Sequence, residues 1–141
     1  MSVPLCFLTM CLVFASCGTV RRGHIISEEG SLARVDWNME ELQSGMAIRH
    51  LRTTHQASYH VIRLRTSESP HVHEEHDLTV FLLAGKARVF IGGRMEEMET
   101  GDVVEIPRGV VHWAQNLGSE ATEVYAVFTP PFDGKDQRVV G

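Results

Sequence analysis

The segment GDVVEIPRGVVHWAQN, residues 101–116, carries the signal that decides the fold of this 141-residue chain. Gly101 and Gly109 permit turn geometries that other residues resist. Pro107 fixes the turn between two short runs, because a proline has no amide hydrogen for the ladder of a central strand. The segment therefore predicts two short strands joined by a tight turn, with His112 delivered inward at the start of the second strand.

The same pattern of strands and turns continues on both sides of this segment. Gly92-Gly93 is typical of a tight hairpin, and only a weak helical signal, around residues 38–42, interrupts the pattern. About eight short strands without a long helix predict an all-β sandwich or barrel that forms a single domain. The strands are expected at residues 46–51, 58–65, 78–83, 87–91, 94–98, 103–106, 111–115 and 122–128.

Charge and cysteine content exclude several classes of function. The chain has 13 Lys and Arg against 18 Asp and Glu, a formal net charge of −5, and no basic run, which argues against nucleic acid as a partner. All three cysteines, Cys6, Cys11 and Cys17, lie in residues 1–20, which carry no Asp, Glu, Lys or Arg. The body of the chain therefore has neither a disulfide framework nor a cysteine-ligated zinc site.

The first residues are expected to form an export signal. An apolar stretch over residues 5–15 ends in small residues, as such signals do. The sequence FASCG, residues 14–18, resembles a bacterial lipoprotein lipobox, and the resemblance implies cleavage before Cys17 and lipidation of Cys17. The protein would then be a membrane-anchored lipoprotein of a bacterial cell envelope, facing the periplasm or the exterior. Arg21 and Arg22 follow the apolar run and leave an alternative, an uncleaved anchor with the domain facing the cytoplasm.

Histidine is the residue type that indicates chemistry in this chain. Three of its eight histidines, His71, His73 and His76, fall within six residues, and His112 lies at the start of a later strand. Side chains two residues apart on a strand share a face, so His71 and His73 can chelate one ion. Neutral imidazole is a ligand for zinc, iron, copper and nickel. His60 is assigned to the rim of the barrel rather than to the surroundings of the ion.

Residues 101–116 resemble the second sequence motif of the cupin superfamily. That motif reads Gly, five residues, Pro, one residue, Gly, two residues, His, three residues, Asn, and its positions are filled by Gly101, Pro107, Gly109, His112 and Asn116. The resemblance covers residues 45–130 and is to small single-domain cupins. It implies a double-stranded β-helix, the cupin jelly-roll barrel, with a metal site inside.

The first cupin motif is matched only in part. His71, His73 and Gly85 occupy their positions, but Leu78 stands seven residues before Gly85, where the motif has a carboxylate. Asp77 is one residue earlier and fits only the spacing from His73.

The predicted ligand set therefore joins the histidines of both motifs. It consists of His71, His73 and His112, with Asp77 as fourth ligand and His76 as the alternative to it. The cofactor is one divalent transition metal ion, iron, manganese, nickel, copper or zinc, since all of them accept such ligands. No catalytic residue is assigned.

These observations lead to one division of the chain and to competing functions. The expected parts are a signal peptide or anchor over residues 1–16, a tether over 17–44, a cupin domain over 45–132 and a tail over 133–141.

The first hypothesis for the function is a metal-dependent enzyme, dioxygenase- or isomerase-like, acting on a small organic molecule. The alternatives are a lipid-tethered, non-catalytic module that binds a metal or a small sugar-like ligand, and a barrel without metal. Membrane contact would run through the N-terminal lipid or anchor, and a homodimer is a further expectation.

Overall fold

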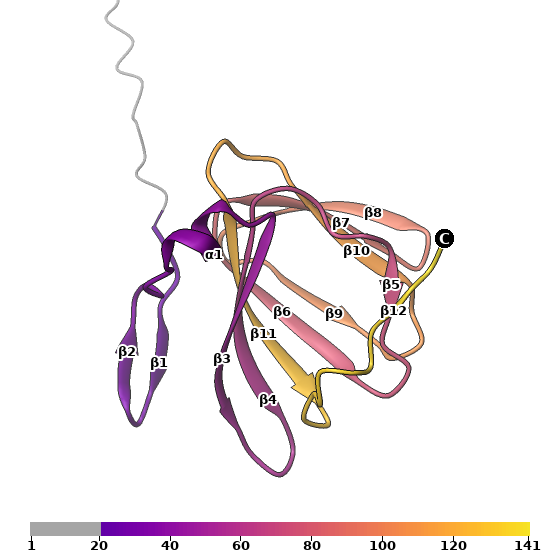
Figure 1. The fold of residues 1–141 in the computed structure, drawn as a ribbon, viewed down its shortest axis with the longest axis horizontal. Helices are drawn as coiled ribbons and strands as arrows, with labels where there is room; N and C mark the ends of the chain where they lie inside the picture. Colours follow the sequence, from indigo (N-terminus) through magenta and orange to yellow (C-terminus); the bar gives the residue numbers. More distant parts are fainter. Residues whose placement is uncertain (1–20) are drawn as a thin grey trace, which may run out of the picture.

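The computed structural model describes residues 21–141 (Figure 1). The predicted signal peptide and the lipidation site at Cys17 lie outside these residues. Over residues 21–141, none of the helical structure is long and apolar enough to serve as a membrane span.

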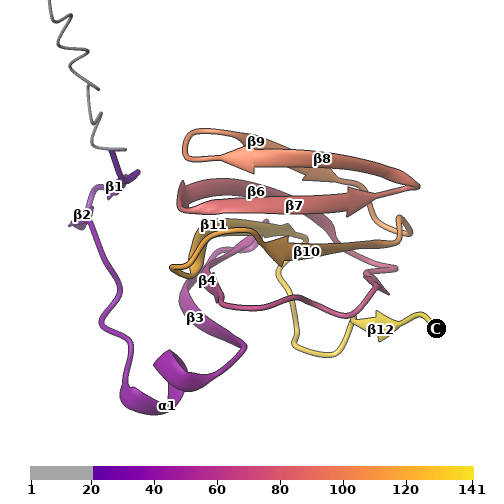
Figure 2. The same cartoon turned by 90° about the horizontal axis from the view of Figure 1, so that it is seen from above.

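Two five-stranded antiparallel sheets face each other and enclose the interior of a jelly-roll barrel (Figures 1 and 2). The all-β prediction is confirmed, and each of the eight expected strands is present. One sheet has the order β12-β5-β10-β7-β8 and the other has the order β3-β4-β11-β6-β9. Their bounds are β3 Met46–Thr53, β4 Ser58–Leu64, β5 His71–Val72, β6 Asp77–Ala84, β7 Lys86–Ile91, β8 Arg94–Glu99, β9 Val103–Ile106, β10 His112–Asn116, β11 Thr122–Thr129 and β12 Arg138–Val139.

Alternation along the strands explains how the barrel fills. Side chains of a strand point alternately to its two faces, so Ala126 and Phe128 of β11 are buried while Thr129 is exposed. Phe128 packs with Leu78 of β6 and Ile106 of β9 in one buried cluster. A second cluster joins the two sheets and consists of Leu82, Ala87, Val89 and Met98. The core is therefore assembled from the inward faces of both sheets.

The segment expected to be a tether is structured from residue 25 onward. It contains the hairpin of β1 (Ile25–Ser27) and β2 (Gly30–Leu32), which lies outside the barrel in Figure 1, and the helix α1 (Met39–Gln43). A capping box of Asn38 and Glu41 begins this helix. Arg22 and Trp37 both donate hydrogen bonds to the carboxylate of Glu123, so the segment is fixed to β11.

The C-terminal segment also belongs to the barrel. After β11, residues 130–137 cross one end of the interior, and we call them the C-terminal strap. Phe132 of the strap stacks on Phe128 with ring centroids 4.7 Å apart. The strap leads into β12, which pairs with β5. The tail expected to start at residue 133 thus contributes a strand next to the histidine segment.

Gly85 joins β6 to β7 at a place where the backbone has no room for a side chain. Its φ is +94°, and a Cβ atom there would lie 3.0 Å from the Cα of Thr122. Gly93, in the turn between β7 and β8, has a similar φ of +84°, but a Cβ there would meet nothing within 4 Å.

We therefore expect Gly85→Ala to lower the free energy of unfolding by about 2–4 kcal/mol and Gly93→Ala by only about 1–2 kcal/mol. Both variants carry the cost of a positive φ, and only the first adds the clash with Thr122. Urea denaturation of the two variants measures the difference. Equal losses would show that the approach to Thr122 is not a constraint.

Candidate metal centre

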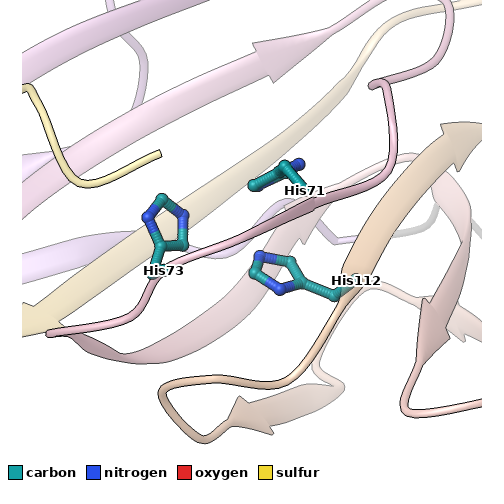
Figure 3. A group of neighbouring side chains, drawn as sticks. All are labelled: His71, His73 and His112. Atoms are coloured by element: carbon teal, nitrogen blue, oxygen red, sulfur yellow. The ribbon is translucent and has the colours of Figure 1, made fainter. Parts of the chain in front are cut away.

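Pairing of β5 with β10 brings the two histidine segments together. His71 lies directly opposite His112 in the antiparallel register, and His73 follows β5. All three side chains are buried, and each offers a nitrogen atom within 4.8 Å of those of the other two. Figure 3 shows the three rings gathered around one point. The structure thus brings together the three histidines that the sequence predicts as ligands.

Backbone carbonyl groups fix how each of these rings is protonated. The Nδ1 atoms of His71 and His112 donate to the carbonyl oxygens of Ser69 and Val110, at 2.8 and 2.9 Å. The Nδ1 atom of His73 donates to the carbonyl oxygen of Asp136. A carbonyl oxygen only accepts, so in the neutral form of each ring Nδ1 carries the hydrogen and Nε2 keeps its lone pair. The Nε2 atom of His112 is buried without a hydrogen-bond partner.

Burial favours the neutral, metal-binding form of two of these rings. Loss of solvent lowers the pKa of His112 to about 4, and the neighbouring His71 and His73 lower it further against the opposing effect of the Val110 carbonyl. Burial also lowers the pKa of His73, which the Asp136 carbonyl partly offsets. Because a metal ligand must have a free lone pair, neutral rings at neutral pH are ready to coordinate. The three Nε2 atoms therefore fit a divalent transition metal ion.

Asp77, the predicted fourth ligand, is not part of the histidine cluster in this structure. Asp77 is exposed, and its carboxylate accepts hydrogen bonds from the guanidinium and the backbone amide of Arg108, at 2.8–3.2 Å. These hydrogen bonds lower the pKa of Asp77 to about 2. The next residue, Leu78, is buried and lines the interior. The inward position at the start of β6 is thus occupied by an apolar side chain, and Asp77 faces away from the cluster.

His76, the alternative fourth ligand, has no nitrogen left for a metal. Its Nδ1 atom donates to the carboxylate of Asp136 at 2.5 Å, and its Nε2 atom contacts the carbonyl oxygen of Pro131 at 3.2 Å. Both partners belong to the C-terminal strap, so contacts with the strap engage both ring nitrogens. His76 therefore fastens the C-terminal strap instead of completing the cluster.

Asp136 is the centre of this attachment, and the sequence analysis did not single it out. Its carboxylate accepts from the amides of Glu74 and Glu75 at 2.9 Å each, and from His76. Burial raises the pKa of Asp136, but these hydrogen bonds outweigh that effect and bring it to about 2. The carbonyl of the same residue holds His73. One strap residue thus fixes both the loop after β5 and the ring of a candidate ligand.

Glu68 is a second residue that the sequence analysis missed. It lies in the loop before β5, where its amide donates to the carbonyl of Ala114 and its Oε2 atom accepts from the Ala114 amide at 2.8 Å. These contacts seat the carboxyl group beside β10, on the wall of the interior. Burial raises the pKa of Glu68, although His71 and the Ala114 amide oppose the change. No local periodicity reveals this position, because the pairing with β10 creates it.

A cavity of about 440 Å³ opens from the three histidines into the barrel. This volume lies within the usual range for sites that bind small molecules. His60 is buried and lines the cavity, with its ring 5.4 Å from Phe128, so its assignment to the rim is wrong. Phe132 of the strap lines the same cavity.

Comparison with known proteins gives the family. Residues 59–128 match the family described as the cupin domain. An uncharacterized protein of Aquifex aeolicus is 41% identical over 86 residues, which are 61% of this chain and 70% of that protein. The chain belongs to the cupin family.

Solved cupin structures share the fold at low sequence identity. KdgF from Halomonas sp. superposes with a TM-score of 0.62 at 24% identity, covering 70% of this chain and 89% of that one. TT1209 from Thermus thermophilus gives a TM-score of 0.58 at 20% identity, covering 69% and 98%. PAC13 from Streptomyces, solved with uridine, gives 0.59 at 13% identity, covering 77% and 92%. At these identities the likeness concerns the fold alone.

The remaining cupin motif residues hold the loops around the cluster. The amide of Gly109 donates to the carbonyl of His73 at 2.7 Å, and the carbonyl of Pro107 accepts from Val110 in the turn between β9 and β10. Gly101 and Gly109 both adopt positive φ, at +104° and +77°. The motif thus ties the turn before His112 to the segment that carries His73.

Asn116 ends β10 and organises the loop that follows. Its Nδ2 atom donates to the carbonyls of Arg65, Gly118 and Glu120, and its Oδ1 atom accepts from the hydroxyl of Thr122. Its role is therefore structural.

We expect Asp136→Ala to weaken metal binding about 10–100-fold, the usual effect of removing a group that orients a ligand. Loss of the carboxylate releases the strap and with it the carbonyl that holds His73. Competition against a chelator of known affinity measures the change.

Asp77→Asn is the matched control for this measurement. It removes a carboxylate from the same end of the barrel, yet we expect unchanged metal affinity because Asp77 is engaged with Arg108. A loss in the Asp77→Asn variant equal to that of Asp136→Ala would contradict the assignment.

Proposed function

We propose that this cupin is a metal-dependent enzyme that acts on a small organic molecule, with dioxygenase- or isomerase-like chemistry. One observation carries the proposal. Three buried imidazoles have their Nδ1 atoms held by carbonyl groups, which leaves three Nε2 lone pairs at the end of a cavity large enough for a small molecule. Rings satisfied by one another or by the loop would not leave the Nε2 atom of His112 buried without a partner.

His71, His73 and His112 would hold the ion, which is iron, manganese, nickel, copper or zinc. When bound, such an ion supplies a Lewis acid for a substrate oxygen and, for the redox-active metals, a site for dioxygen. Three protein ligands leave coordination positions free for the substrate or water.

Residues of the chain provide the other requirements of catalysis. Glu68 presents a carboxyl group on the cavity wall, and its Oε2 atom is held by the Ala114 amide. Its raised pKa suits a group that takes up and returns a proton at Oε1. Phe128 and Phe132 cover the histidine cluster, with ring centroids 5.3 and 5.5 Å from His73, and exclude water from that side.

We also propose that the N-terminal segment attaches this cupin to a membrane, as a lipoprotein with Cys17 lipidated. The support is the uncharged sequence of residues 1–20 and its lipobox-like ending. Cleavage at this site is recognised by mass spectrometry of the mature N-terminus. An intact Met1 in the membrane fraction would instead support an uncleaved anchor.

The metal centre is tested by His112→Ala. We expect the unaltered protein to bind one equivalent of transition metal and the variant to lose stoichiometric binding, because two imidazoles alone form a weak site. Elemental analysis after metal supplementation measures the content, and a rise in Tm on metal addition reports the linkage of binding to folding.

His55→Ala is the control, since His55 is an exposed histidine in the turn between β3 and β4. It should leave metal content and the metal-dependent rise in Tm unchanged. Full retention of metal by His112→Ala would contradict the ligand set.

Turnover distinguishes the enzyme from a binding module. Oxygen consumption and product formation by the metal-loaded protein are measured with small diketones and catechols. We expect Glu68→Gln to lower the rate of any such reaction more than the metal content. A metal-loaded protein that binds these molecules without converting them would favour the non-catalytic module.

A further inference from the structure

The wall of the cavity is mostly apolar, whereas the end formed by the three histidines is polar. Away from the cluster it is lined by aliphatic side chains from the sheet of β3, β4, β6, β9 and β11, among them Ile62, Val80, Leu82 and Val104. These are neighbours in register, since Val124 of β11 lies opposite both Ile62 and Leu82, and Val80 lies opposite Val104. The inward faces of these strands thus form a mostly hydrocarbon surface, which His50 and His60 interrupt at one side.

Among the described residues that line the cavity, none is a lysine or an arginine. Several arginines of the described residues are instead engaged in ion pairs with acidic side chains. Arg108 is bound to Asp77, and Arg138 pairs with Glu74. Arg49 pairs with Glu41, and its guanidinium lies over the Trp37 ring outside the barrel. The protein therefore places no permanent positive charge on this wall.

His60, at the side of the cavity, is shifted toward its neutral form. Burial lowers the pKa of His60 at the side of the cavity, and His50 lowers it further. The carboxyl groups that line the cavity, those of Glu68 and Asp133, add no positive charge. A ligand with several negative charges would thus lose its hydration without gaining a cationic partner beyond the metal.

We propose that the site takes a small molecule with one oxygen-donor head and an uncharged, apolar alkyl or aryl body. Phosphorylated, sulfonated and polycarboxylate ligands are excluded. The part of this inference that concerns the head rests on the proposed metal centre, and the part that concerns the body rests on the cavity wall alone.

The proposal is tested with two catechols that share the same diol head, one with an apolar body and the other with an anionic body. The full-length protein is loaded with zinc, which is not redox-active, and titrated with 4-tert-butylcatechol and with catechol-3,5-disulfonate. We expect the tert-butyl compound to bind at least tenfold more tightly than unsubstituted catechol, and the disulfonate at least tenfold more weakly. Zinc content is measured again after each titration, so that removal of zinc by the catechol is recognised. Disulfonate binding as tight as that of the tert-butyl compound would overturn the proposal.

A metal-free arm separates the two parts of the inference. In protein stripped of metal, 4-tert-butylphenol should still bind more tightly than 4-phenolsulfonate, because the preference belongs to the wall. Failure to take up zinc would reject the metal centre and the oxygen-donor head together. Loss of the preference for the apolar phenol would reject the apolar body, whatever the zinc result.

Val80→Thr and Val103→Thr supply a matched pair of variants. Val80 lines the cavity, whereas Val103, on the neighbouring strand β9, is exposed. The new hydroxyl group at position 80 would lie unpaired against the ligand, so 4-tert-butylcatechol should bind about tenfold more weakly. The same change at position 103 should leave binding unchanged. Equal effects of the two variants would show that the body does not contact this wall.

Discussion

The site depends on one short pairing, the contact of β5 with β10. β5 contains only two residues, yet its register places His71 opposite His112 and so joins segments about forty residues apart in the chain. Shifting this pairing by one residue would turn the histidine of one strand away from the interior. The surrounding hydrogen bonds keep the register fixed. Gly109 bonds to the carbonyl of His73, and Glu68 bonds to Ala114 on β10.

Each candidate ligand is oriented by the backbone rather than by another side chain. The carbonyls of Ser69 and Val110 belong to residues two positions before their histidines, so local chain geometry sets the rings of His71 and His112. His73 differs, because its carbonyl partner comes from Asp136 in the strap. The geometry of the cluster is thus mostly local but is completed by a distant segment. A carbonyl partner fixes the orientation and the tautomer of a ring without adding the negative charge that a carboxylate partner would bring.

The sequence predicted the barrel because its signals are local. Strand alternation and the turns at Gly92, Gly93 and Pro107 can be recognised within short windows of the sequence. The three histidine ligands were predicted from equally local patterns, the spacing of residues along single strands. The outward position of Asp77 was not predicted, because spacing along the chain does not determine the face of a strand, and a shift of one residue exchanges the inward and outward faces. The role of Glu68 was invisible, since only its pairing with a strand far along the chain places its carboxyl group on the cavity wall. His60 was predicted at the rim because the sequence of one strand does not show how deep the cavity between the two sheets extends.

The strap also allows the metal affinity and the stability of the barrel to change separately. Both sheets, apart from β12, are formed by residues that precede Asp136. Without the strap, the ring of His73 would lack its carbonyl partner, and the loop after β5 would lack the carboxylate that holds it. Proteolytic loss of residues 133–141 would consequently lower the metal affinity more than it would destabilise the two sheets.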